Sequence, residues 1–345
     1  MQSQDPQKPL LSVIMPMFNA AATIERCLAP LLVMLAKGEI EELIVVDDGA
    51  TDPSPQMAAA HAGVRLLRMP QQAGPGGARN MGVEQARGSH VWFVDSDVIV
   101  RPDAASIISQ TFTETGAAAV FGCYDDTPDA QNFLSQYKNL VHRYYHRRGN
   151  HDASTFWAGC GAVERSLYLQ LGGFDAARYR YPSIEDIELG YRIAATGRRI
   201  VLRPELQGKH LKIWRLKNLL HTEVFRRAIP WSMLMLERKH LTNDLNVSTG
   251  ERLRALLSLA LVLTSLGWAA GWSGPWPFAI AAAVCVAANR DLLQFFVSRR
   301  GWWFGLRAFA YHQFYYLYSS AAFAYSMLLH QLQGQRVASP GAKAG

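Results

Sequence analysis

The segment that decides the fold is Val91-Trp92-Phe93-Val94-Asp95-Ser96-Asp97-Val98-Ile99-Val100. Its first four residues are apolar, which predicts a strand buried on both faces of a parallel sheet. Asp95 and Asp97 follow the end of that strand, where open α/β sheets bind their ligands. Two carboxylates at this point suit a hard divalent cation that also holds phosphates. The alternative is a polar turn, because Asp is common in turns.

The length and charge of the chain set the first limits. Its 345 residues are enough for two domains, and its net charge of +7 favours anionic partners such as nucleotides, nucleic acids or lipid headgroups. The four cysteines have no metal-binding or redox spacing, which indicates reduced cysteines in a cytosol-facing protein. The polar stretch from Met1 to Pro9 predicts that no signal peptide is present. The mean hydropathy of −0.03 hides a shift in composition near residue 250.

The first hundred residues alternate between short apolar runs and helical spacing. The apolar runs predict four strands, at residues 10–15, 43–46, 64–67 and 91–94. Helical apolar spacing predicts helices at residues 23–35 and 78–86, and Gly74-Pro75-Gly76-Gly77 is expected to form a loop. Alternating strands and helices predict an α/β domain whose parallel sheet is covered on both faces.

The residues that follow the first two predicted strands suit a nucleotide. Asp47 and Asp48 close the second strand, so they face the same edge of the sheet as Asp95. A carboxylate there can accept the ring N–H of a base or the hydroxyls of a ribose, and a solvated Asp-Gly turn is the alternative. Phe18 could lie against the base and Asn19 could fix it, but a core side chain and a helix cap are equally compatible with the sequence.

A glycine-rich motif, Gly76-Gly77-Ala78-Arg79-Asn80, follows the third predicted strand. Its spacing and its place in the chain differ from the dinucleotide-binding fingerprint, which argues against an NAD-dependent enzyme. The glycines still allow backbone N–H groups to approach a phosphate, and the following helix N-terminus favours an anion. Arg79 adds a permanent positive charge that suits a diphosphate, and an ion pair within the fold is its alternative role.

The segment Tyr181–Leu189 is expected to begin a helix that carries Glu185 and Asp186 in its first turn. Ser183 and Asp186 have the spacing of a capping box, and the helix dipole alone favours acids at this position. The alternative is a chemical role for Asp186. A helix N-terminus is expected to lower the pKa of Asp186 and keep it ionised, which suits a group that accepts a proton at neutral pH.

Five motifs occur in the order and spacing of one enzyme family. They are Pro16–Asn19, Val45–Asp52, Gly76–Asn80, Asp95–Asp97 and Glu185–Asp186. In this respect the chain resembles the family 2 glycosyltransferases, which have the Rossmann-like GT-A fold, over roughly residues 10 to 210. The resemblance implies a nucleotide-diphosphate sugar as donor, either a UDP-sugar or a GDP-sugar, and Mg²⁺ or Mn²⁺ as cofactor.

The resemblance also implies roles for individual residues. The residues implied to bind the nucleotide-sugar are Pro16, Phe18, Asn19, Asp47, Asp48, Gly77, Arg79 and Asp95. Asp186 is implied to be the catalytic base, and Glu185 to be its neighbour that orients an acceptor or Arg79. The segment Phe156–Val163, expected to be a strand with small residues, is implied to lie under the donor sugar.

Three residues are implied to bind the metal, namely Asp95, Asp97 and His210. His210 matches a position that serves as a further metal ligand in part of the GT-A enzymes. A neutral imidazole binds manganese as carboxylates do. The alternative is a surface histidine among lysines.

Residues 214–241 combine Trp, Leu, Phe and Ile with basic side chains. Their spacing predicts helices that lie in a membrane surface, with a break at Ile229-Pro230-Trp231. Processive members of the family carry Gln-x-x-Arg-Trp near this place, whereas this chain has Arg226–Trp231, which disfavours long-polymer synthesis coupled to export. Nucleic-acid binding is the alternative role of the arginines, and the tryptophans favour a membrane interface.

The stretch Ala255–Trp272 has no charged residue and is just long enough to cross a bilayer. Phe278–Ala288 is expected to return, and Phe304–Leu329 is a third candidate, so two or three spans are expected. Arginines flank the first two spans on one side: Arg252, Arg254, Arg290, Arg299 and Arg300. The positive-inside rule places that side of a bacterial inner membrane, and the catalytic domain, in the cytoplasm. A buried hairpin of a soluble protein is the alternative.

The predicted organisation is a GT-A catalytic domain at 1–211, interface helices at 212–250, transmembrane helices at 251–332 and a flexible tail at 333–345. The predicted enzyme is an inverting hexosyltransferase that acts on a lipid or lipid-linked hydroxyl, without nucleic acid as a partner. Three other hypotheses stay open: a polyprenyl-phosphate glycosyltransferase, a nucleotidyltransferase, and a non-catalytic nucleotide-binding subunit of an envelope-polysaccharide export complex. The Glu185–Asp186 pair favours a hydroxyl acceptor, because an anionic phosphate needs no base.

Overall fold

The computed structural model describes residues 9–238, 243 and 245–338 of the chain. The chain forms two compact units, Met1–Trp214 and Arg215–Gly345. Most of the stretch Met1–Pro9, on which the absence of a signal peptide was predicted, lies outside the described residues. Residues 339–345 of the predicted tail also lie outside them.

The first unit is built on one sheet with the strand order β3-β2-β1-β4-β8-β6-β9-β5, and β7 pairs with β9. Its strands are β1 Leu11–Met17, β2 Glu42–Asp47, β3 Val64–Arg68, β4 His90–Val94, β5 Val98–Val100, β6 Ala119–Tyr124, β7 Asp152–Ala153, β8 Cys160–Glu164 and β9 Ile200–His210. The strands β1 to β4 run parallel, whereas β8 is antiparallel to β4 and β6, and β5 is antiparallel to β9. The predicted α/β class is confirmed, and the sheet is mixed rather than wholly parallel.

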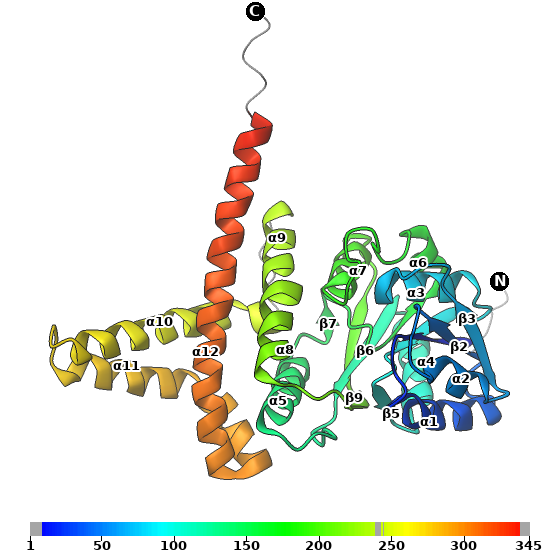
Figure 1. Cartoon of the computed structure of the whole chain (residues 1–345), viewed down its shortest axis with the longest axis horizontal. Coiled ribbons are helices and arrows are strands. Elements are labelled where there is room, and N and C mark those ends of the chain that lie inside the picture. Colours follow the sequence, from blue (N-terminus) through cyan, green and yellow to red (C-terminus); the bar gives the residue numbers. More distant parts are fainter. Residues whose placement is uncertain (1–8, 239–242, 244, 339–345) are drawn as a thin grey trace, which may run out of the picture. The chain divides into compact units, whose positions relative to one another are not determined.

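Helices cover both faces of this sheet (Figure 1). One face packs against α1 Ile24–Ala36, α2 Ser54–Ala59 and α4 Ala104–Thr115. The other face packs against α3 Gly74–Glu84, α6 Arg165–Gln170 and α7 Glu185–Ala195, and α5 Phe133–Arg148 packs beside β6. Successive residues of a strand point to opposite faces, so Val13 lies in the first core and Ile14 in the second.

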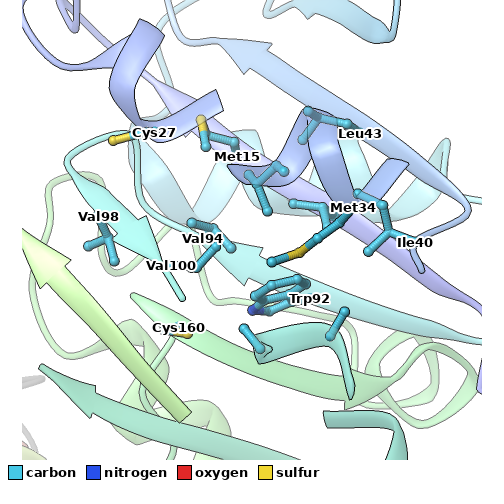
Figure 2. Packing of buried hydrophobic residues seen from close by; sticks show 14 of the residues in the cluster. Met15, Cys27, Met34, Ile40, Leu43, Trp92, Val94, Val98, Val100 and Cys160 are labelled. Atoms are coloured by element: carbon cyan, nitrogen blue, oxygen red, sulfur yellow. The ribbon is translucent and has the colours of Figure 1, made fainter. Parts of the chain in front are cut away.

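The strand β4 is the most deeply buried part of the site-bearing segment. Val91, Trp92, Phe93 and Val94 are all fully buried. Figure 2 shows the indole of Trp92 close to the side chain of Met34 from α1. Because the core fixes this strand up to its last residue, the position of the aspartates that follow is fixed as well.

Two predicted elements differ from the structure. The glycines of residues 74–77 form the first turn of α3 rather than a loop. Gly74 has a φ of +79°, and a Cβ there would lie 2.1 Å from the carbonyl oxygen of Arg180, so the close approach of another segment requires glycine. The sequence of Arg198–Leu202, two arginines followed by an apolar run, predicts an edge strand. The segment instead leads into β9, which lies between β6 and β5.

The second unit is helical. It contains α8 Leu216–His221, the π-helix η1 Thr222–Ala228, α9 Ile229–Glu237, the short 3₁₀ helix η2 Leu245–Val247, α10 Thr249–Ala269, α11 Pro275–Ala288 and α12 Arg290–Ala338. Pro230 lies in the first turn of α9, so the predicted break is a change from π to α geometry. Gly301 interrupts α12 with a non-helical φ of +80°.

Within the described part of the chain, α10 is the one helix that is long and apolar enough to cross a membrane unaided. The helix α11 and residues 290–332 of α12 make a second candidate only if this pair, bent by 67°, counts as one span. Phe304–Leu329 does not meet this criterion by itself, and the expected third span stays a prediction. Polar side chains such as His312 and Gln313 lower its hydropathy, and both are buried.

Candidate active site

The carboxyl ends of the parallel strands bring the predicted residues to one edge of the first unit's sheet. The Asp95–Asp97 loop follows β4, and two backbone hydrogen bonds hold it there. The N–H of Asp95 donates to the carbonyl of Gly159 at 3.3 Å, and the N–H of Leu211 donates to the carbonyl of Asp97 at 2.9 Å. Gly159 immediately precedes β8 and Leu211 immediately follows β9. The loop is therefore fixed between two neighbouring segments of the same edge.

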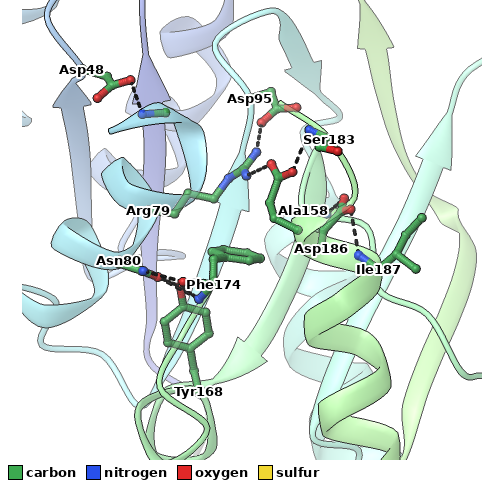
Figure 3. A network of polar contacts seen from close by, with 12 residues as sticks. Asp48, Arg79, Asn80, Asp95, Ala158, Tyr168, Phe174, Ser183, Asp186 and Ile187 are labelled. Atoms are coloured by element: carbon green, nitrogen blue, oxygen red, sulfur yellow. Dashed lines mark hydrogen bonds and ion pairs between the residues drawn. The ribbon is translucent and has the colours of Figure 1, made fainter. Parts of the chain in front are cut away.

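Arg79 lies at the centre of a buried ion-pair network (Figure 3). Its Nη2 donates to Oδ1 of Asp95 at 2.6 Å, and its Nη1 donates to Oε1 of Glu185 at 3.2 Å. Burial acts to lower the pKa of Arg79, but the two carboxylates hold it above its usual value. The ion pair within the fold, one of the two roles considered from the sequence, is present. A contact from Arg79 to a diphosphate stays a prediction.

Asp186 is held by two backbone amides in the first turn of α7. The N–H of Ala158 donates to its Oδ2 at 3.1 Å, and the N–H of Ile187 donates to its Oδ1 at 2.8 Å (Figure 3). Burial, together with the charge of Glu185, raises the pKa of Asp186 to about 7. The expectation that the helix N-terminus lowers this pKa is wrong, because desolvation and a neighbouring carboxylate outweigh the helix dipole and both amide bonds.

The start of α7 differs from the capping-box alternative, which would make Ser183 the N-cap residue. The N-cap residue is Ile184, and it supplies no side-chain cap. The N–H of Ser183 donates to Oε2 of Glu185 at 2.8 Å, and Glu185 in turn accepts from Arg79. Asp186 accepts from Ala158, 28 residues away in the sequence. The two acids therefore connect the start of α7 to other segments of the site, and Asp186 also accepts the N–H of Ile187 in the first turn of the helix.

Asp97 and His210 form the pair that suits a metal ion. Nε2 of His210 lies 3.7 Å from Oδ2 of Asp97, and the imidazole stacks on Tyr124 with 4.3 Å between ring centroids. Burial acts to raise the pKa of Asp97, but the neighbouring imidazole of His210 contributes to holding it below its usual value. Among the described residues, no three ligating side chains gather into a ready-made site. One carboxylate and one imidazole fit a divalent cation that takes its other ligands from a diphosphate and water.

Asp47 and Asp48 lie at the predicted nucleotide end of the edge and are buried. The two carboxylate oxygens of Asp48 accept the N–H groups of Ala73 and Gly74 at 2.8 and 2.9 Å, which joins β2 to the start of α3. Burial raises the pKa of Asp48. Oδ1 of Asp47 accepts two N–H groups of the following turn, at 3.1 and 2.8 Å. Both aspartates therefore shape the loops at this end, and a bond to a nucleotide stays a prediction.

The other residues predicted to bind the nucleotide lie beside them. Phe18 is 47% exposed beyond the end of β1, so its ring is accessible to a ligand. Asn19 has a φ of 50°, and its Oδ1 accepts the N–H of Thr51 at 2.8 Å, which ties the β1 loop to the loop after β2. Pro16 is buried within β1, and Gly77 is buried in α3. Neither Pro16 nor Gly77 presents an exposed side chain, and a contact of either with a nucleotide stays a prediction.

The hydrogen bonds of Asn80 in this region were not predicted from the sequence. Nδ2 of Asn80 donates to the carbonyl of Phe174 at 2.8 Å, and its Oδ1 accepts the N–H of Phe174 at 2.9 Å and the hydroxyl of Tyr168 (Figure 3). These bonds fasten the Gly172–Phe174 turn to α3. The position of Asn80 directly after Arg79 in the glycine-rich motif was the available signal.

Comparisons with known proteins agree with this architecture. Residues 12–172 match the model of the family described as Glycosyl transferase family 2. An uncharacterized protein, MT1568, of Mycobacterium tuberculosis (strain CDC 1551 / Oshkosh) is 30% identical over 200 residues, which cover 53% of this chain and 62% of that protein. The glycosyltransferase GlyG of Streptococcus pneumoniae serotype 4 is 33% identical over 119 residues, which cover 33% of this chain and 39% of GlyG. The match thus spans less than two thirds of either relative.

Solved structures share the fold at low sequence identity. The mannosyltransferase PcManGT from Pyrobaculum calidifontis, in complex with GDP-Man and Mn²⁺, aligns with a TM-score of 0.56 at 19% identity, over 94% of this chain and 88% of that one. TarS of S. aureus in complex with UDP-GlcNAc aligns with a TM-score of 0.50 at 19% identity, over 81% of each chain. Residues 12–172 therefore match the family 2 glycosyltransferases, within a unit that has the GT-A fold, and a C-terminal helical region follows.

Proposed function

We propose that this chain is a membrane-bound, inverting glycosyltransferase that moves a hexosyl group from a nucleotide-diphosphate sugar to a hydroxyl of a lipid or lipid-linked glycan. One observation carries the proposal. The N–H of Ala158 binds Asp186, and the carbonyl of the next residue, Gly159, binds the N–H of Asp95. Two adjacent residues thus connect the proposed base to the proposed metal-binding loop, so proton transfer and departure of the diphosphate are served by one site.

The donor in this proposal is a UDP-sugar or a GDP-sugar, bound with Mg²⁺ or Mn²⁺. Support comes from the ligands named for TarS and PcManGT, which are UDP-GlcNAc, and GDP-Man with Mn²⁺. Asp97 and His210 would hold the cation, with Asp95 beside them. When bound, a divalent cation neutralises charge on the leaving nucleoside diphosphate. Phe18, Asn19 and the Asp47–Asp48 loop would contact the nucleoside.

Asp186 has the proton affinity that a general base needs near neutral pH. A carboxylate with a pKa of about 7 is about half ionised at pH 7, and it holds a proton better than an ordinary aspartate does. We assign it the proton of the acceptor hydroxyl, which attacks the anomeric carbon on the face opposite the diphosphate and so inverts its configuration. A polyprenyl phosphate acceptor is already anionic and needs no such base, so the state of Asp186 favours a hydroxyl.

The proposed membrane contact rests on the second unit. Along α10, Leu256, Leu263 and Leu266 are 63%, 60% and 59% exposed, respectively. Exposed leucines along a helix that is long enough to span a bilayer favour lipid as their surroundings. With the arginines at the ends of the candidate spans, we place the chain in a bacterial inner membrane with its catalytic domain in the cytoplasm.

The test uses the full chain in nanodiscs of phosphatidylethanolamine and phosphatidylglycerol. UDP-hexoses and GDP-hexoses are supplied with Mg²⁺ or Mn²⁺, and glycolipids or undecaprenyl phosphate serve as acceptors. The proposal expects release of nucleoside diphosphate and a product whose anomeric configuration, read by NMR, is opposite to that of the donor. Release of pyrophosphate from a nucleoside triphosphate indicates a nucleotidyltransferase instead. Absence of any turnover with either metal indicates the non-catalytic subunit.

A further inference from the structure

The start of α1 is bonded to the proposed metal-binding loop. Oγ1 of Thr23 donates to the carbonyl of Ser96 at 2.7 Å, and Sγ of Cys27 donates to the same carbonyl at 3.3 Å. Thr23 is the N-cap residue of α1, and Cys27 lies one turn further on the same face. Ser96 separates the two aspartates of the motif, and its carbonyl belongs to the peptide that joins Ser96 to Asp97.

The same face of α1 is also linked to His210. The guanidinium of Arg26 makes two hydrogen bonds to the carboxylate of Asp129, at 3.0 and 2.7 Å. The N–H of Asp129 donates to the carbonyl of His210 at 3.3 Å. The first turn of α1 therefore holds the Asp97 loop directly and the His210 backbone through one residue. In this way it supports the separation of the two proposed metal ligands, which the backbone bond from Leu211 to Asp97 also holds.

The residues immediately before α1 are bonded to the proposed nucleotide end. The N–H of Ala20 donates to Oγ of Ser54 at 3.3 Å, and the N–H of Ala21 donates to Oδ2 of Asp52 at 2.8 Å. Asp52 and Ser54 lie in the segment that follows Asp48. With the bond from Asn19 to Thr51, residues 19–21 are tied to the loop after β2 as residues 23–27 are tied to the loop after β4.

We propose that residues 19–27 couple nucleotide binding to divalent-cation binding, with Thr23 and Arg26 as positioning residues. This inference deepens the proposed function and rests on it. A nucleotide that orders the loop after β2 and a cation that orders Asp97 and His210 favour the same placement of residues 19–27. Two ligands that favour one state increase each other's affinity. Thr23 and Arg26 contribute to this coupling without contacting either ligand.

The measurement is isothermal titration calorimetry of UDP and of GDP binding to the full chain, in EDTA and in saturating MnCl₂. For each nucleotide, the ratio of its affinity in MnCl₂ to its affinity in EDTA measures the coupling. Thr23→Val keeps the shape of the side chain and removes its hydrogen-bond donor. The increase in nucleotide affinity that Mn²⁺ causes should therefore fall about two- to tenfold, and Thr23→Ser should restore it. Arg26→Gln should reduce the gain by up to about fivefold, because exposed ion pairs contribute little. Affinity in EDTA should not change.

Matched controls exist within the same unit. Arg101→Gln removes a similar exposed pair, in which Arg101 makes bonds of 3.0 and 2.8 Å to Asp103, and Thr113→Val removes a threonine-to-carbonyl bond of 2.9 Å in α4. Neither control variant should alter the coupling.

A charge swap gives a further test. The double variant Arg26→Asp with Asp129→Arg should recover the part of the coupling that Arg26→Gln loses. Titration of MnCl₂ alone, followed by electron paramagnetic resonance, should show weaker Mn²⁺ binding in Thr23→Val.

Several outcomes would overturn the inference. They are an unchanged Mn²⁺-dependent gain in both variants, an equal loss of affinity with and without Mn²⁺, or a wild-type chain whose nucleotide affinity ignores Mn²⁺. If Thr23→Val fails to fold, the test is made with Arg26→Gln, because a substitution at this half-exposed position should not prevent folding. If the wild type binds neither UDP nor GDP under any condition, the proposed function itself fails.

Discussion

Arg79 and Asp95 are joined by a 2.6 Å hydrogen bond, which makes a predicted metal ligand the partner of a buried guanidinium. The same guanidinium also binds Glu185. A cation that binds Asp95 therefore shares that carboxylate with Arg79. Arg79 therefore contacts the proposed donor site through Asp95 and the neighbour of the proposed base through Glu185.

The first prediction concerns this guanidinium. Arg79→Met leaves two largely buried carboxylates without their partner, which should destabilise the first unit by about 3 kcal/mol. Arg79→Lys keeps the charge but replaces the two separate guanidinium nitrogens with one ammonium nitrogen, which cannot keep the geometry of both bonds. It should therefore lose less stability than Arg79→Met but most of the activity. Thermal unfolding and nucleoside diphosphate release measure the two effects. A fully active Arg79→Lys would show that the two-armed bridge is dispensable.

The second prediction is a pH shift in Glu185→Gln. The negative charge of Glu185 raises the pKa of Asp186, and removing it also frees Arg79 to act more strongly on Asp186. Both changes lower the pKa of Asp186. The wild-type kcat/KM should fall as the pH decreases through about 7, and the variant should start this fall at a lower pH. An acid limb at the same pH in both proteins would remove Asp186 from the role of base.

The third prediction concerns the Asp97–His210 pair. Asp97→Ala should abolish the Mn²⁺-dependent part of nucleotide binding, because it removes the more exposed of the two paired groups. His210→Ala should weaken that part, and His210→Asn should retain more of it if the imidazole acts as a ligand. Titration of UDP and GDP with and without Mn²⁺ gives the Mn²⁺-dependent part of nucleotide affinity for each variant. Equal affinities for wild type and Asp97→Ala in Mn²⁺ would exclude this pair as the metal site.

The positions of the first four strands along the sequence could be predicted, because runs of apolar residues are a local signal. Runs such as Val91–Val94 and Leu43–Val46 are apolar on both faces, and an aspartate follows each of them. The antiparallel insertion of β8 between β4 and β6 could not be predicted, because strand pairing depends on residues about 70 positions apart. The inner position of β9 could not be predicted for the same reason, because its pairing partners are also far away in the sequence.

The chemical state of the site depended even more on long-range contacts. Arg79 meets partners 16 and 106 residues away, so its local sequence gave only the choice between an ion pair and a phosphate contact. The pKa of Asp186 was predicted with the wrong sign because the helix terminus is a local feature, whereas burial and the orientation of Glu185 are set by the fold. The glycines of α3 looked like a loop because the segment near Arg180 that packs on Gly74 comes about a hundred residues later.

The fourth prediction tests the second unit. Leu263→Arg places a charge in the middle of α10, at a position that is 60% exposed. At the centre of a bilayer this change should cost about 2.5–3.5 kcal/mol for insertion, so less of the chain should stay in the membrane fraction after alkaline carbonate extraction. Leu169→Arg, at a position that is 42% exposed in the first unit, is the control and should not change the membrane fraction. Equal retention of both variants would argue against insertion of α10.

The last prediction joins activity to stability at Asp186. Because folding raises the pKa of Asp186 from its usual value near 4 to about 7, the wild type should lose stability as the pH rises from about 4 to about 7. Asn does not titrate, so Asp186→Asn should gain stability relative to the wild type over the same range, while transfer is lost and nucleotide binding persists. Thermal unfolding between pH 4.5 and 8, with transfer assays at pH 7.5, measures both. A stability difference that stays constant with pH would mean that the carboxylate is already ionised throughout. The proton affinity on which the proposed base depends would then be absent.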